Sequence, residues 1–344
     1  MDPNSPASAS PESLSPYVIL MPVFNDWAAA RLLLQHLDRE LSAHGIAADV
    51  LFVDDCSTDD FPLGVVRDDY AAIRQVDVLT LRRNLGHQRA LAIGLCYVAA
   101  NRPCHAVVVM DADGEDLPAD VPRLIDAYAH AGGRRIVFAR RTRRSEGVLF
   151  TIFYQLYRGL HRLLTGVKVA VGHFSVVPHK LLHRLVIHSA LWNHYSAAVI
   201  HSHLLTALVP TRRGERLVGG SRMSFAALAA HGLSAMSVYA DRIGVRLLAA
   251  TGVVFVLWFA AFCATVAIRL FTTVAIPGWA MIVTGIALIM LSQAGLLALI
   301  FIFMIQRSRA APSFIPARDY EIFVESMRCI REPGASLQLR GARG

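Results

Sequence analysis

The sequence predicts an α/β domain built on a mostly parallel sheet, followed by a hairpin of two membrane-spanning helices. Short apolar segments alternate with helical segments in the first half of the 344-residue chain, and two long uncharged stretches lie in its last third. Alternation of strand and helix is typical of a parallel sheet with helices on both faces. The hydrophobic fraction of 54% is too high for a purely soluble protein.

The predicted strands are short, continuous apolar runs, which are typical of strands buried on both faces of a sheet. The segments between them have the apolar spacing of helices. The predicted strands are Tyr17–Val23, Asp49–Val53, Val76–Leu81, Ala106–Met110 and Ile136–Ala139, and the predicted helices are Trp27–His44, His87–Ala100 and Val121–His130.

The uncharged stretches Leu247–Ile268 and Trp279–Ile305 predict the two membrane helices. At about 1.5 Å per residue, each is long enough to cross a hydrocarbon core of roughly 30 Å. Pro277 and Gly278 mark a turn between them, so we expect a hairpin. Two buried core helices are the alternative, but core helices of this length usually carry a polar stripe.

Amphipathic segments precede the hairpin. One of them, Gly147–Gly166, has apolar residues with interspersed arginines and suits a membrane interface, although an ordinary surface helix fits equally well. The first residues lack the basic and apolar blocks of a signal peptide. We therefore expect a disordered leader (1–16), the α/β domain (17–224), a juxtamembrane interfacial helix (225–246), the hairpin (247–305) and a cytoplasmic tail (306–344).

The net charge of +8 comes almost wholly from arginine. A basic chain can bind nucleic acid, anionic lipid or phosphorylated substrates. Beside a membrane hairpin, lipid headgroups and phosphates are the favoured partners, and nucleic acid is not expected. The chain has no GxGxxG or GxxxxGK[ST] segment, which argues against dinucleotide oxidoreductases and P-loop NTPases.

Acidic residues follow three predicted strands, in the segments PVFND, VDDCSTD and MDADGED. The carboxyl ends of parallel strands face one crevice, so we expect these segments to converge. Asp111 and Asp113 have the spacing to share one divalent cation, whose open positions would take phosphate oxygens. The alternative for such a motif alone is a solvated turn in which Asp116 or Asp120 caps the next helix.

Six segments in this order resemble glycosyltransferase family 2, in particular its polyprenyl-phosphate glycosyltransferases (the dolichol-phosphate mannose synthase-like group). The resemblance covers roughly residues 17–306. It implies a GT-A-type (Rossmann-like) fold, Mg²⁺ or Mn²⁺ as cofactor, and inverting transfer of a sugar from a nucleotide-sugar donor to a polyprenyl phosphate. The segments are PVFND, VDDCSTD, NLGHQRAL, DADGED, ARRTRR and GERLVGGSRMS.

The resemblance also implies roles for individual residues. The implied metal ligands are Asp111, Asp113 and Glu115, with Glu115 standing where the family usually has glutamine. The implied nucleotide contacts are Pro22, Phe24, Asp26, Val53, Asp55, Asp111 and Ala112. The implied catalytic residues are Asp113, Arg140 near the sugar and phosphates, and Arg216 and Arg222, which grip phosphate groups in a loop that closes over the donor.

Two other functions stay open: a catalytically inactive membrane scaffold that binds nucleotide sugars, and a processive polysaccharide synthase. Two spanning helices are few for a polymer channel. Arginines at the outer flanks of the hairpin favour cytosolic termini and a cytosolic catalytic domain at the inner membrane, with membrane lipids as partners. A homo-oligomer formed through the hairpin is also compatible. The flanking arginines are Arg242, Arg246, Arg307, Arg309 and Arg318, against Arg269 at the turn.

Overall fold

The computed structural model describes residues 17–59, 66, 69–141, 148–167, 171–219, 225–272, 278–310 and 314–332. The predicted leader and Arg222 lie outside these residues. The chain divides into two compact units. The first comprises Met1–Glu146, Val169–Val238 and Phe314–Gly344, and the second comprises Gly147–Lys168 and Tyr239–Ser313.

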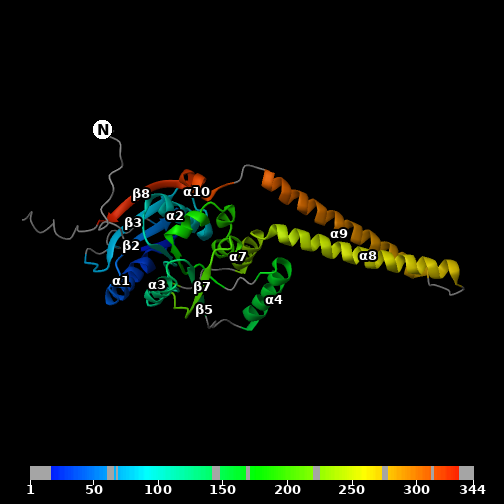
Figure 1. The fold of residues 1–344 in the computed structure, drawn as a ribbon, viewed down its shortest axis with the longest axis horizontal. Helices are drawn as coiled ribbons and strands as arrows, with labels where there is room; N and C mark the ends of the chain where they lie inside the picture. The colour runs from blue at the N-terminus through cyan, green and yellow to red at the C-terminus, as the bar shows by residue number, and fades with distance from the viewer. Residues whose placement is uncertain are drawn as a thin grey trace, which may run out of the picture. The chain divides into compact units, whose positions relative to one another are not determined.

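In the described part of the first unit, eight strands form one sheet in the order β7-β5-β6-β4-β1-β2-β3-β8. Strands β4, β1, β2 and β3 run parallel, whereas β6 is antiparallel to β4 and β5. Strand β8 is antiparallel to β3 and lies beside it at the edge of the sheet (Figure 1). The strands are β1 (Tyr17–Val23), β2 (Ala48–Asp54), β3 (Ile73–Leu81), β4 (Ala106–Val109), β5 (Ile136–Arg141), β6 (Ser175–Pro178), β7 (Thr206–Thr211) and β8 (Val324–Arg331).

Helices cover both faces of this sheet, because successive side chains of a strand point to opposite faces. Ile19 and Met21 of β1 belong to the core beneath α1 and α3, and Val18 and Leu20 belong to the core beneath α2. The helices of this unit are α1 (Trp27–Ala43), α2 (His87–Asn101), α3 (Asp120–His130), α5 (His179–Leu185), α6 (Tyr195–His201), α7 (Phe225–Ser237) and α10 (Pro316–Asp319), with the short 3-10 helices η2 (Ser189–Trp192) and η3 (Tyr320–Phe323).

The predicted α/β fold with a mostly parallel sheet is confirmed, and the five predicted strands correspond to β1 to β5. The sequence predicts a cytoplasmic tail after the long helices (306–344). This segment contains β8, which pairs with β3 and completes the sheet. The chain therefore returns to its first unit after the hairpin.

The second unit contains α4 (Val148–Thr165) and the two long apolar helices α8 (Ala240–Phe271) and α9 (Gly278–Ala310). Within them, Ala240–Ile268 and Ile282–Met304 are long and apolar enough to cross a membrane, with mean hydropathies of 2.3 and 2.5. A guanidinium nitrogen of Arg246 on α8 donates a hydrogen bond to the carbonyl oxygen of Leu163 at 2.7 Å. This bond attaches the last turn of α4 to the first turns of α8.

Candidate functional site

The acidic segments that follow β1, β2 and β4 lie at one edge of the sheet. These strands are neighbours and parallel, so their carboxyl ends face the same side, as predicted. Asp26 follows β1, Asp54 ends β2, and Asp111 begins the acidic loop after β4. The loop of residues 212–219 after β7, which we call the arginine loop, reaches the same place through ion pairs.

Arg216 of the arginine loop joins two of the predicted site residues. One of its terminal nitrogens pairs with the Asp26 carboxylate, and the other lies 3.3 Å from Oδ2 of Asp113. Its Nε donates to the carbonyl oxygen of Val218 at 3.0 Å. Asp113, Asp26 and Arg216 therefore meet in space although they are far apart in the sequence.

Glu115 pairs with two further arginines that the sequence did not single out. Arg213 donates from NH2 to Oε1 of Glu115 at 2.7 Å and from Nε to Oε2 at 3.0 Å, a two-pronged contact. Arg141 lies 3.8 Å from Glu115 and 3.1 Å from the buried carboxylate of Asp116. The predicted metal ligand Glu115 is thus held by arginines in this structure.

Backbone hydrogen bonds hold the arginine loop against the acidic loop. The amides of Gly214 and Leu217 donate to the carbonyl oxygens of Glu115 and Asp113, both at 2.9 Å. Gly114 between them has a φ of +89°, and a Cβ at this position would lie 2.5 Å from Cγ of Leu217. Only glycine fits both the backbone angle and the close approach.

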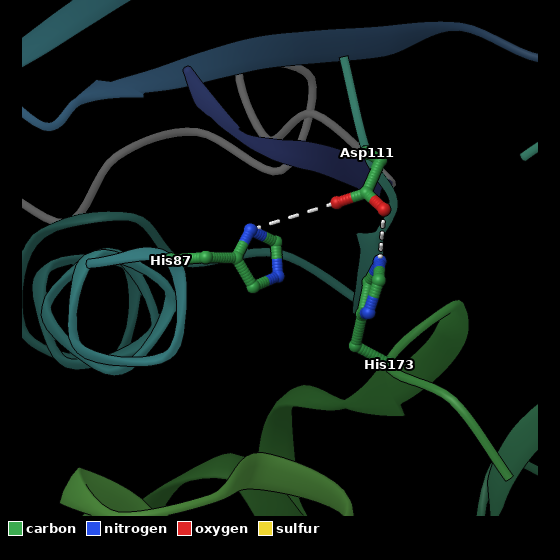
Figure 2. A group of neighbouring side chains, drawn as sticks. All are labelled: His87, Asp111 and His173. Carbon is green, nitrogen blue, oxygen red and sulfur yellow. Dashed lines mark ion pairs between the residues drawn. The ribbon is translucent and has the colours of Figure 1, made fainter. Parts of the chain in front are cut away.

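Asp111 faces two histidines (Figure 2). Nε2 of His173 lies 2.9 Å from Oδ2 of Asp111, and Nδ1 of His87 lies 3.6 Å from Oδ1. His173 also lies 3.4 Å from the Asp116 carboxylate. The two imidazoles thus approach different oxygens of the same carboxylate, from α2 on one side and from the segment before β6 on the other.

His173 reaches Asp111 because of the antiparallel pairing of β4 and β6. This pairing joins Val109 to Ser175, and two more residues along each chain bring Asp111 opposite His173. No feature of the sequence indicates β6 as a neighbour of β4. The sequence does indicate the position of His87, because His87 begins the predicted helix that follows the third strand.

Burial and neighbouring charges shift the pKa values of the carboxyl and imidazole groups of this site. Burial and then the charges of Asp111 and Glu115 raise the pKa of the Asp113 carboxyl to about 6, although Arg216 opposes this rise. Burial would also raise the pKa of Asp111, but His173, His87 and Arg141 bring it below the usual range. Burial would lower the pKa of His173, but Asp111 and Asp116 raise it above the usual range.

The other predicted site residues lie around this centre with different surroundings. Both oxygens of Asp55 accept backbone hydrogen bonds, from Leu85 at 2.7 Å and Gly86 at 2.8 Å, so Asp55 positions the loop before α2. Its predicted contact with the base stays a prediction. The remaining predicted nucleotide contacts are the buried Pro22, Val53 and Ala112 and the exposed Phe24.

Arg140 is exposed at the end of β5 and forms no ion pair within the described residues. Its neighbour Arg141 makes the contacts with the acidic loop. Adjacent residues of a strand point to opposite faces, which explains why only one of the two arginines reaches Glu115 and Asp116.

The donor atoms at Asp111 fit a divalent cation. His87, Asp111 and His173 each offer one ligand atom. These three atoms lie within 4.8 Å of one another. Imidazole nitrogens and carboxylate oxygens bind such ions at about 2.0–2.2 Å, which places neighbouring ligand atoms roughly 3–4 Å apart. Asp113, two residues from Asp111, adds another carboxylate to the same loop.

In open α/β sheets, ligands bind beyond the carboxyl ends of the strands, which is where this sheet has its carboxylates and arginines. Residues 18–186 match the family model "Glycosyl transferase family 2". The α/β domain therefore belongs to this glycosyltransferase family, with a GT-A-like fold followed by two long apolar helices.

Curated relatives are distant. An uncharacterized glycosyltransferase, YkcC, of Bacillus subtilis is 28% identical over 170 residues, which are 48% of this chain and 50% of that protein. The undecaprenyl-phosphate 4-deoxy-4-formamido-L-arabinose transferase of Klebsiella pneumoniae (strain 342) is 24% identical over 212 residues, 60% of this chain and 62% of that one. The chain thus spans about half the length of the first relative and less than two thirds of the second.

Solved structures also resemble this chain. Mannosyl-3-phosphoglycerate synthase from Rubrobacter xylanophilus has a TM-score of 0.47 and 17% identity, over 66% of this chain and 73% of that one. Glucosyl-3-phosphoglycerate synthase from Mycobacterium tuberculosis, in complex with Mn²⁺, UDP-glucose and phosphoglyceric acid, has a TM-score of 0.45 and 18% identity. The match covers 66% of this chain and 79% of that one.

Proposed function

We propose that the protein is a membrane-bound inverting glycosyltransferase that transfers a sugar from a nucleotide-sugar donor to a polyprenyl phosphate. The observation that carries the proposal is the convergence of Asp26, Asp111 and Asp113 with Arg216 at one edge of the sheet. Membership of family 2 and the relatives named for undecaprenyl-phosphate sugar transfer support it.

Each group has a task in this proposal. Asp111 and Asp113 bind a divalent cation, which when present would stabilise the charge that develops on the leaving diphosphate. Arg216 and Arg213 present guanidinium groups to the phosphates, and such preorganised charges are often the largest contribution to catalysis. A phosphate oxygen of the acceptor is already anionic near neutral pH, so no strong general base is needed. The proposal also assigns phosphate contacts to Arg222 and Arg140, as the sequence resemblance implies.

The sugar-transfer proposal is tested by incubating the purified protein with a panel of nucleotide sugars, polyprenyl phosphate and Mg²⁺ or Mn²⁺, with the products identified by mass. One sugar added to one lipid phosphate supports the proposal. No turnover with any donor, while a nucleotide sugar still binds, identifies the scaffold alternative. A long polymer product identifies the polysaccharide synthase.

Arg216→Ala is expected to lower transfer about 100-fold without reducing the membrane association of the protein, because the Arg216 side chain is only 14% exposed and pairs with the carboxylates of Asp26 and Asp113. Initial rates and flotation with liposomes measure the two properties. The matched control is Arg31→Ala, which removes an exposed arginine of α1. Equal losses of transfer in both variants, or parallel losses of transfer and flotation, would contradict a phosphate-binding role.

The pairing of β8 with β3 supports the proposed membrane topology. The residues after α9 join the same sheet as the residues before α8. Both segments must therefore lie on the same side of the membrane, and the two apolar helices cross the membrane together as a hairpin. The arginines at their outer flanks favour the cytosolic side for the α/β domain.

We expect Thr272→Cys, at the end of α8, to react with a membrane-impermeant maleimide in intact cells. Glu325→Cys, exposed on β8, should react only after the cells are opened. Both variants are made with the exposed Cys263 and Cys329 replaced by serine. Labelling of Glu325→Cys in intact cells would reverse the topology, and labelling of both only after opening would show that the hairpin does not cross.

A further inference from the structure

The carboxylate of Asp111 has imidazole nitrogens beside both of its oxygens (Figure 2). The contacts of 2.9 Å to His173 and 3.6 Å to His87 are close to the separations of neighbouring ligands on one ion. His87 is also the most exposed of the three side chains, at 39%, so the cluster is open to solvent on its side. The three donors therefore have the spacing and the accessibility of a metal site.

Hydrogen bonds hold the backbone beside both histidines. His87 begins α2 directly after Gly86, whose amide is bound by the buried Asp55 carboxylate. The carbonyl oxygen of His173 accepts a hydrogen bond from Oγ of Ser175 at 2.7 Å. A backbone fixed before an ion binds helps to orient the side chains that bind the ion.

Tyr195 connects these two supports. Its hydroxyl lies 2.7 Å from Oγ of Ser175, and its amide donates to the side-chain oxygen of Gln88, the neighbour of His87, at 2.8 Å. Tyr195 is fully buried. One buried residue is thus hydrogen-bonded to both segments that carry the imidazoles, which favours a preformed site over two histidines that lie close together by chance.

We infer that His87 and His173 bind the divalent cation together with Asp111, and that these nitrogen ligands select a first-row transition metal such as Mn²⁺ over Mg²⁺. This inference rests on the proposed function for the presence of the cation at Asp111. Mg²⁺ prefers oxygen ligands and gives up its water reluctantly, whereas imidazole suits transition metals. The other reading of the cluster is a metal-free ion-pair network that only orients Asp111.

The experiment measures binding of Mn²⁺ alone to the purified full-length protein in detergent, by electron paramagnetic resonance. The modulation of the electron spin echo should show nitrogen nuclei coupled to bound Mn²⁺ in the wild-type protein. Binding should weaken about tenfold or more in His87→Ala and in His173→Ala, with unchanged binding in His183→Ala, an exposed histidine of α5. Displacement of Mn²⁺ should need at least about ten times as much Mg²⁺.

Absence of nitrogen coupling in the wild-type protein, or equal Mn²⁺ affinity in all three variants, would overturn the inference. The wild-type spectrum decides the question even when a variant does not fold. Sugar transfer by a protein without nitrogen coupling would refute the histidine ligands and leave the proposed function intact. Nitrogen coupling in a protein that transfers no sugar from any donor would refute the proposed function and leave the metal site intact.

Discussion

Asp113→Asn is expected to lower sugar transfer about 100-fold or more while the protein stays folded. Oδ1 of Asp113 accepts a hydrogen bond from the Glu115 amide at 2.9 Å, and Oδ2 faces Arg216. Asparagine has the same shape but no charge, so it removes the attraction for a cation and for the guanidinium. The measurement is the initial rate of transfer under saturating donor, acceptor and metal.

The same variant should not lower the midpoint of thermal unfolding. Burial and the charges of Asp111 and Glu115 raise the pKa of Asp113 to about 6, so near neutral pH its ionised form costs the folded state free energy. A neutral amide relieves this cost. The matched control is Asp126→Asn, an exposed carboxylate of α3, which should keep full activity. Full transfer by Asp113→Asn, or transfer that persists in excess chelator, would contradict the proposed role of the acidic loop.

The parts of the site that could be predicted are those fixed by local sequence. An apolar run followed by acidic residues identifies both a buried strand and its carboxyl end, and this was sufficient to place Asp26, Asp55 and Asp111 at one edge. The match between predicted and observed β1, Tyr17–Val23 in both cases, shows how clear such a signal is when a strand is buried on both faces.

The parts that could not be predicted depend on pairing between distant segments. His173 meets Asp111 only through the antiparallel register of β4 and β6. Arg141 rather than Arg140 meets the acidic loop because of the face on which each side chain of β5 lies. Arg213 reaches Glu115 from a loop almost a hundred residues later, at a sequence separation of 98. Single-sequence patterns contain none of these pairings.

The strand β8 was missed for a different reason. Its sequence, VESMRCIR, has no continuous apolar run, and its residues are exposed or half-buried. An edge strand of this kind is stabilised by hydrogen bonds to its neighbour and by contacts of the flanking residues. This segment can therefore be recognised as a strand only once its pairing with β3 is known.

Deletion of residues 314–344 is expected to destabilise the α/β domain strongly, because the deleted segment contributes to the core as well as to the sheet edge. The buried Tyr320 accepts a hydrogen bond from Asn101 of α2 at 3.2 Å. Phe314 and Phe323 pack on Trp192, with ring centroids 4.3 and 5.1 Å away. Removing β8 also leaves the hydrogen-bonding groups of β3 without their partner, and an open edge of this kind favours aggregation.

Loss of a single buried aromatic side chain typically costs about 3–5 kcal/mol, and each kcal/mol lowers the midpoint of a domain of this size by about 2–4 °C. We therefore expect the deletion to lower the unfolding midpoint by about 10 °C or more in detergent, measured by scanning fluorimetry, with added loss of monodisperse protein. The control deletion of residues 333–344 removes none of the described contacts. If the longer deletion prevents expression, Tyr320→Ala tests the same packing, with a fall of several degrees expected. Equal midpoints for the wild-type protein and for either the longer deletion or Tyr320→Ala would show that the segment after the hairpin does not support the catalytic domain, and would remove the structural argument that places both on the same side of the membrane.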